Sequence, residues 1–156
     1  MSRAGENILD RSFRMPAVFF LYSGTAWLLL GTLFASLVST KTIMPAFLSE
    51  SDWFAYGHLR PACINALVYG WGGNMIFAAT MWMLARLSWA QIPSPGIPII
   101  SGMAWNGALS LGILGILAGH GTPFELLEMP QYVSLFLYGS FPPSRISSID
   151  FGDTEN

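Results

Sequence analysis

The clearest pattern in this chain is the absence of charged side chains over three long stretches. No charged residue lies between Arg14 and Lys41 or between Arg60 and Arg86, and a third uncharged stretch covers residues 87–124. Each stretch holds the roughly 20 mainly apolar residues that an α-helix needs to cross about 30 Å of hydrocarbon. The pattern therefore predicts three transmembrane helices, at about residues 16–38, 61–85 and 97–119.

Prolines mark the expected helix ends. Pro16 and Pro61 stand at the predicted starts of the first two helices, where a missing backbone N–H has little effect. Pro93, Pro95 and Pro98 separate the second and third helices. We therefore expect these prolines to lie in loops or at helix starts.

Composition bears on the alternatives to a membrane protein. Of 156 residues, 53% are hydrophobic and only 10% are charged. A soluble fold would have to bury three helices that are apolar on every side, with few polar residues to cover them. A cleavable signal peptide is another alternative, but the first apolar stretch is about twice as long as a signal's apolar region. The expected fold class is an all-α integral membrane protein.

Charge and cysteine content narrow the function classes. A net charge of −2 offers no basic surface for nucleic acid, and the single cysteine forms neither an internal disulfide nor a zinc site. The lipid bilayer is the expected environment, and a bacterial inner membrane the expected location. Four basic residues would lie on the same side of the membrane as the N-terminus, and three would lie on the other side. This small excess favours a cytoplasmic N-terminus. The expected domains are a cytoplasmic segment 1–15, a membrane domain 16–131, and a short apolar piece with a disordered polar tail, 132–156.

The second predicted helix carries a stripe of small and polar side chains. Residues at three- and four-residue steps form this stripe: Arg60, Cys63, Leu67, Gly70, Asn74 and Phe77. An amide in lipid needs a hydrogen-bond partner, so Asn65 and Asn74 should point at other helices or at a bound cofactor. We expect the stripe to pack against the third helix through Gly115 and Gly119, or against a partner subunit.

Two motifs resemble the catalytic subunit I of cbb3-type cytochrome c oxidases. Residues 56–74 resemble the start of that family's second helix, in which a Leu-Arg-Pro turn precedes an Asn-Ala pair and then Gly-Gly-Asn. Residues 125–130, Glu-Leu-Leu-Glu-Met-Pro, resemble the family's acidic segment ending in Glu-Trp-Pro. The resemblance spans about residues 16–132 and implies the first helices of a haem-copper oxidase subunit I.

The resemblance implies particular site residues. The family reduces oxygen at a haem and copper centre and receives electrons through a low-spin haem b, whose axial histidine falls at the position of Cys63. A thiolate is a haem ligand in some proteins, but a free cysteine is more often a small buried residue, which would mean that the ligand is lost. Arg60 and Asn74 are the other cofactor-binding candidates. His58 is expected in a loop at the membrane surface, not as a substitute ligand.

Residues after the third helix have less specific roles. His120 is expected to lie at the surface or to cap the helix end, and Glu125 and Glu128 are expected on a solvated interfacial face rather than on a proton path. The family's copper ligands and remaining haem ligands lie on later helices. The resemblance therefore implies no catalytic residue and no copper site in this chain, and haem b only together with partner subunits.

Three functions remain open. The first is that the chain is a component of a respiratory oxidase. It would be a truncated or split subunit I that assembles with other oxidase subunits or with the missing C-terminal part and cannot reduce oxygen alone. The second is that the chain is a non-catalytic membrane scaffold or assembly protein. A small transporter or channel would require a repeated half or ionisable residues within the helices, and the sequence has neither.

Overall fold

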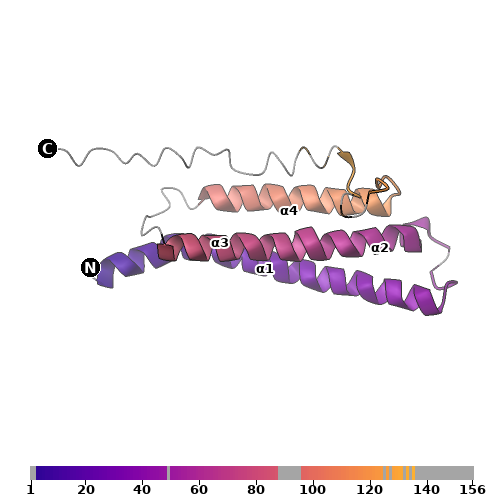
Figure 1. The fold of residues 1–156 in the computed structure, drawn as a ribbon, viewed down its shortest axis with the longest axis horizontal. Coiled ribbons are helices and arrows are strands. Elements are labelled where there is room, and N and C mark those ends of the chain that lie inside the picture. The colour runs from indigo at the N-terminus through magenta and orange to yellow at the C-terminus, as the bar shows by residue number, and fades with distance from the viewer. Residues whose placement is uncertain are drawn as a thin grey trace.

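The computed structural model describes residues 3–48, 50–87, 96–124, 126, 128–131, 133 and 135. All regular elements in these ranges are helical, and they lie side by side along one direction (Figure 1). The long helices are α1 (Arg3–Ile43), α2 (Tyr56–Asn65), α3 (Gly73–Leu87) and α4 (Gly96–Leu117). A short 3₁₀-helix, η1 (Asp52–Phe54), precedes α2, and a π-helix, η2 (Ala66–Gly72), joins α2 to α3.

The helices α2, η2 and α3 follow one another without a break, and we call them the central rod. Both residues that flank η2, Asn65 and Gly73, have right-handed helical dihedral angles. Figure 1 shows the central rod between α1 on one side and α4 on the other. The region predicted as the second transmembrane helix is therefore one continuous helical segment with a wider turn in its middle.

Two helices are long and apolar enough to cross a membrane, at Phe13–Ile43 and Gly96–Leu117. They match the first and third predicted spans. The central rod is divided by η2 into pieces of 10, 7 and 15 residues, each shorter than a membrane-spanning helix by itself. The structure thus supports two of the three predicted spans directly.

The expectation that proline marks the helix starts was wrong at two positions. Helix α1 begins at Arg3 and continues through Pro16, and α2 begins at Tyr56 and continues through Pro61. A proline inside a helix leaves one backbone carbonyl without its usual donor, which helices in a membrane tolerate when other groups pack around the site. Pro16 is fully buried. Of the three prolines predicted between the second and third helices, Pro98 lies in the first turn of α4. Pro93 and Pro95 lie outside the described residues. Nearly all of the predicted C-terminal segment, residues 132–156, lies outside them as well.

Helix α1 packs through a seam that repeats every seven residues. The buried side chains of this seam are Phe13, Phe20, Trp27, Phe34 and Lys41. A seven-residue repeat keeps one face of a helix against its neighbour over a long distance. The seam therefore holds α1 along the central rod.

The faces that point away from these contacts are apolar. Large exposed side chains occur on every long helix, for example Tyr22 on α1, Ile76 on α3 and Ile100 on α4. Soluble monomers rarely expose apolar surface of this extent. The arrangement suits a surrounding of lipid or of further helices.

Candidate functional site

Cys63 lies on α2, in the middle of the contact with α1. Its side chain is 9% exposed. Its Sγ donates a hydrogen bond to the backbone carbonyl of Gly31, at 3.5 Å. A sulfur that donates a hydrogen bond carries a proton, so this geometry is that of a thiol packed between two helices.

The stripe around Cys63 is covered by α1. A Cβ atom added at Gly31 would lie 2.6 Å from Leu67 Cδ2, and one added at Gly70 would lie 2.7 Å from the Trp27 ring. A Cβ added at Gly24 would lie 3.2 Å from Asn74 Cβ. Glycines on both helices therefore allow α1 and the central rod to approach closely.

The predicted partner of this stripe was wrong in part. Most of the stripe meets α1, which was not predicted. A Cβ added at Gly119 would lie 3.4 Å from Nε2 of His58, which is not part of the stripe, and the φ of Gly119 is +83°. His58 leaves little room for a side chain at this position, and the positive φ would strain any residue other than glycine.

Asn74 makes the inter-helix hydrogen bonds that the sequence predicted. Its Nδ2 donates to Asn106 Oδ1 on α4, at 3.1 Å, and its Oδ1 accepts from Asn106 Nδ2, at 3.2 Å. The Nδ2 group also donates to the Gly70 carbonyl, at 2.6 Å. Asn106 Oδ1 accepts a second hydrogen bond from Trp27 Nε1 on α1, at 2.7 Å. This network joins α1, α3 and α4, and its members Trp27 and Asn106 were not predicted.

Asn65 is fully buried and reaches the segment after α4. Its Nδ2 donates to the Pro61 carbonyl, at 2.9 Å, and to Glu128 Oε2, at 2.6 Å. Asn65 Oδ1 has no hydrogen-bond partner within the described part of the chain. The expectation of a solvated Glu128 was wrong, since its side chain is only 8% exposed. Glu125 lies outside the described residues.

The other candidate residues lie at the ends of helices. His58 is in the first turn of α2, not in a loop as predicted, and its Nδ1 lies 2.9 Å from the Asp52 carbonyl oxygen. His120 is exposed just after α4, in agreement with a surface position. Arg60 is exposed on α2, three residues before Cys63, whereas Cys63 and Asn74 are buried between helices.

A haem does not fit at Cys63 in this arrangement. The sulfur is engaged with Gly31, and the space beside the stripe is filled by Trp27 and Leu67. Within the described ranges, no group of three or more His, Cys, Asp or Glu side chains is placed to hold a metal ion. A macrocycle would have to separate α1 from the central rod.

Known proteins similar to this chain carry the names of cytochrome c oxidase subunits. The chain is 25% identical over 111 residues to a cytochrome c oxidase subunit 1 homolog of Azorhizobium caulinodans, a match that covers 71% of this chain and 20% of the relative. It is 22% identical over 122 residues to the bacteroid subunit 1 homolog of Bradyrhizobium diazoefficiens, with coverage of 78% and 22%. It is 19% identical over 118 residues to the cbb3-type cytochrome c oxidase subunit CcoN1 of Stutzerimonas stutzeri, with coverage of 76% and 25%.

These similarities confirm the resemblance found in the motifs. The chain is similar to cytochrome c oxidase subunit 1 homologs and to a cbb3-type subunit CcoN1. It spans about a fifth to a quarter of the length of these relatives, an extent consistent with their N-terminal portion. No family model and no solved structure matches the chain.

Proposed function

We propose that this chain is a membrane-embedded component of a cbb3-type cytochrome c oxidase and forms the N-terminal helices of a subunit 1-like core. The observation that carries the proposal is a similarity to oxidase subunits over 71–78% of the chain. The two apolar helices and their exposed apolar faces support a location in the membrane. We further propose that the central rod also crosses the bilayer, and that this is the inner membrane of a bacterium.

The exposed apolar faces support assembly with further helices. In the proposed complex these faces contact the C-terminal part of a subunit 1, or other oxidase subunits, as well as lipid. The Asn74–Asn106–Trp27 network holds the three helical segments in register, because each amide in a membrane must find its partner on a neighbouring helix. The chain contributes structure to the core.

Its own residues supply no haem ligand in this proposal. The Cys63 thiol donates to the Gly31 carbonyl in a closed contact, which supports loss of the axial ligand at this position. Any haem b and all oxygen chemistry then depend on the partner chains. By itself the chain does not reduce oxygen.

A second candidate is a non-catalytic scaffold or assembly protein derived from subunit 1. The observation that favours it is the same closed contact at Cys63, because a protein that guides assembly needs the helix surface but no ligand. The two candidates differ in whether haem accompanies the purified protein.

Purification of the full chain with its native partners in mild detergent tests the proposal. We expect a haem absorption band and a co-purifying protein that bears the later helices of subunit 1. The Cys63→Ser variant should keep this band, since the hydroxyl also donates to Gly31 and the sulfur is no ligand. Membrane integration without haem would favour the scaffold. A haem band carried by the chain alone and lost in Cys63→Ser would contradict our account of this residue.

A further inference from the structure

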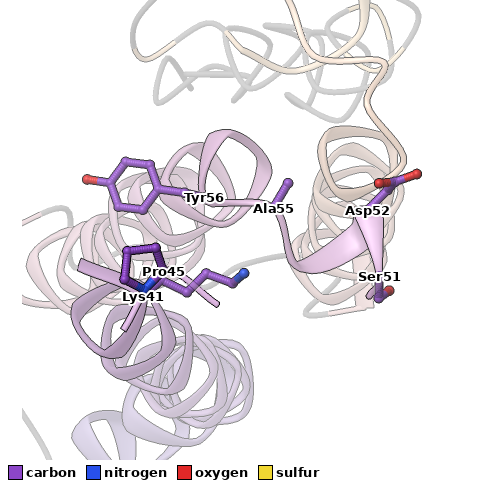
Figure 2. A pocket seen from close by; sticks show the side chains of 6 residues that line it. All are labelled: Lys41, Pro45, Ser51, Asp52, Ala55 and Tyr56. Carbon is purple, nitrogen blue, oxygen red and sulfur yellow. The ribbon is translucent and has the colours of Figure 1, made fainter. Parts of the chain in front are cut away.

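A pocket of about 400 Å³ lies where α1 ends and the central rod begins. It is lined by Lys41, Pro45, Ser51, Asp52, Ala55 and Tyr56 (Figure 2). Lys41 is in the last turn of α1, within the apolar segment Phe13–Ile43. If α1 crosses the membrane, this pocket lies at the boundary between hydrocarbon and water.

Lys41 brings a positive charge without a counter-charge to this pocket. Its side chain is only 8% exposed, because it continues the seven-residue seam by which α1 packs. The structure gives Lys41 no hydrogen-bond or salt-bridge partner within the described ranges. The seam covers the carbon chain of Lys41, and the ammonium group ends at the pocket. An anion in the pocket would supply the counter-charge that this group lacks among the described residues.

The other polar groups around the pocket are compatible with an anion. Figure 2 shows the Lys41 side chain extending toward the side of the pocket that Ser51 forms, whereas the Asp52 carboxylate points away from Lys41. The Ser51 side chain makes no capping hydrogen bond to η1, so its hydroxyl is free to donate to a ligand. An ammonium group and a hydroxyl are suitable donors for a phosphate oxygen.

The surroundings of the pocket favour a lipid over a soluble anion. Exposed apolar side chains follow Lys41 along the chain and lie before α2: Ile43, Met44, Phe47, Leu48 and Trp53. Ile43 is 83% exposed. Such side chains suit acyl chains and the interface region, where tryptophan is common. A free phosphate ion would leave them without a contact.

We propose that this pocket binds the phosphate group of a membrane phospholipid, held by the Lys41 ammonium group and the Ser51 hydroxyl. The proposal rests on the membrane location of α1 and not on assembly with an oxidase. It therefore stands or falls separately from the role of the chain in that complex.

Native mass spectrometry of the full chain in detergent micelles, titrated with dioleoyl phosphatidylethanolamine, tests the proposal. We expect one saturable lipid site in the wild type and binding weakened by roughly tenfold in Lys41→Met, since a hydrogen bond to a charged group is lost. Lys41→Arg should retain binding, and Ser51→Ala should weaken it by roughly threefold. Arg86→Met is the matched control, because it removes one cation at the opposite end of the central rod and should leave binding unchanged.

Two further probes identify the recognised group. Dioleoylglycerol, which lacks the phosphate, should not occupy the site, and inorganic phosphate should not displace the phospholipid. Equal binding of dioleoylglycerol would overturn the proposal, as would displacement by inorganic phosphate, which would indicate a soluble-anion site. Wild-type affinity in both Lys41→Met and Ser51→Ala would overturn it as well. Ser51→Ala keeps the test decisive if Lys41→Met does not fold.

Discussion

At the scale of single residues, aromatic side chains packed on glycines bring the helices together. The Trp27 ring on α1 lies over Gly70 in η2, and the Phe20 ring on α1 lies over Gly102 on α4. In each case a Cβ atom on the glycine would come within 2.8 Å of the ring. Helix association in lipid depends on such close packing, because lipid chains are as apolar as the side chains themselves. A single added methyl group is therefore a sensitive probe.

The variant Gly70→Ala should be destabilised by about 1–3 kcal/mol, because its methyl group overlaps the Trp27 ring and forces the two helices apart. Gly107→Ala is the control, since nothing lies within 4 Å of a Cβ atom added there. That control should be neutral or more stable by up to about 1 kcal/mol through helix propensity. Unfolding of both variants in a dodecyl sulfate titration, followed by circular dichroism, measures the difference. Equal stability of the two variants would show that this contact is not tight.

At the scale of elements, the π-helix η2 decides which faces of the central rod meet α4. Asn65 and Asn74 are nine positions apart, which in a regular α-helix would place them about 180° apart around the axis. The wider turn of η2 between them reduces this rotation. Both amides then face the same neighbours. Asn74 bonds to Asn106 on α4, and Asn65 bonds to Glu128 in the segment that follows α4. A π segment at such a point often accompanies a functional role.

Replacement of Asn106 tests whether the three helical segments depend on its amide. Asn106→Leu leaves Trp27 Nε1 and both polar atoms of Asn74 without their partner on α4, and we expect a loss of about 1–3 kcal/mol. Ser110→Ala is the control, because its hydroxyl bonds only to the Asn106 backbone carbonyl at an exposed position. Resistance to dissociation of the helices in detergent measures the effect. An Asn106→Leu variant as stable as Ser110→Ala would contradict this role of the network.

At the scale of the whole molecule, the exposed apolar surface requires a surrounding of lipid or further helices. α1 and α4 have the length and composition of membrane spans, and the central rod lies between them (Figure 1). Because the central rod packs along both helices, we propose that it runs through the same layer as they do. Its two ends, near Tyr56 and Leu87, should then lie on opposite sides of the membrane.

Cysteine labelling in intact vesicles tests this topology. In a Cys63→Ser background, Ser49→Cys should react from outside, whereas Leu87→Cys should react only from the cytoplasmic side. The orientation follows from the basic residues near the N-terminus. Reaction of both cysteines from one side would show that the central rod does not cross, and release of the chain by carbonate would remove the membrane location altogether.

The order of apolar and charged residues was enough to locate two long apolar helices, and two motifs were enough to indicate the family that the chain resembles. The apolar stretches at 16–38 and 97–119 correspond to α1 and α4 because hydropathy is a property of consecutive residues. The motif at residues 56–74 indicated oxidase subunits, and the chain is similar to such subunits over 71–78% of its length. The need of Asn74 for a partner on another helix also followed from its chemistry.

Which helix surfaces meet could not be predicted from the sequence and is known from the packing of the helices. The partner of Asn74 is Asn106, the cover of the Cys63 stripe is α1, and the acid that meets Asn65 is a buried Glu128. The burial of Lys41 beside a pocket also depends on how α1 packs. None of these pairs is encoded in local periodicity, because each joins residues from different helices or from the segment after α4. Their pairing is set by the relative rotation of the helices, which side-chain shape and the wide turn of η2 determine together.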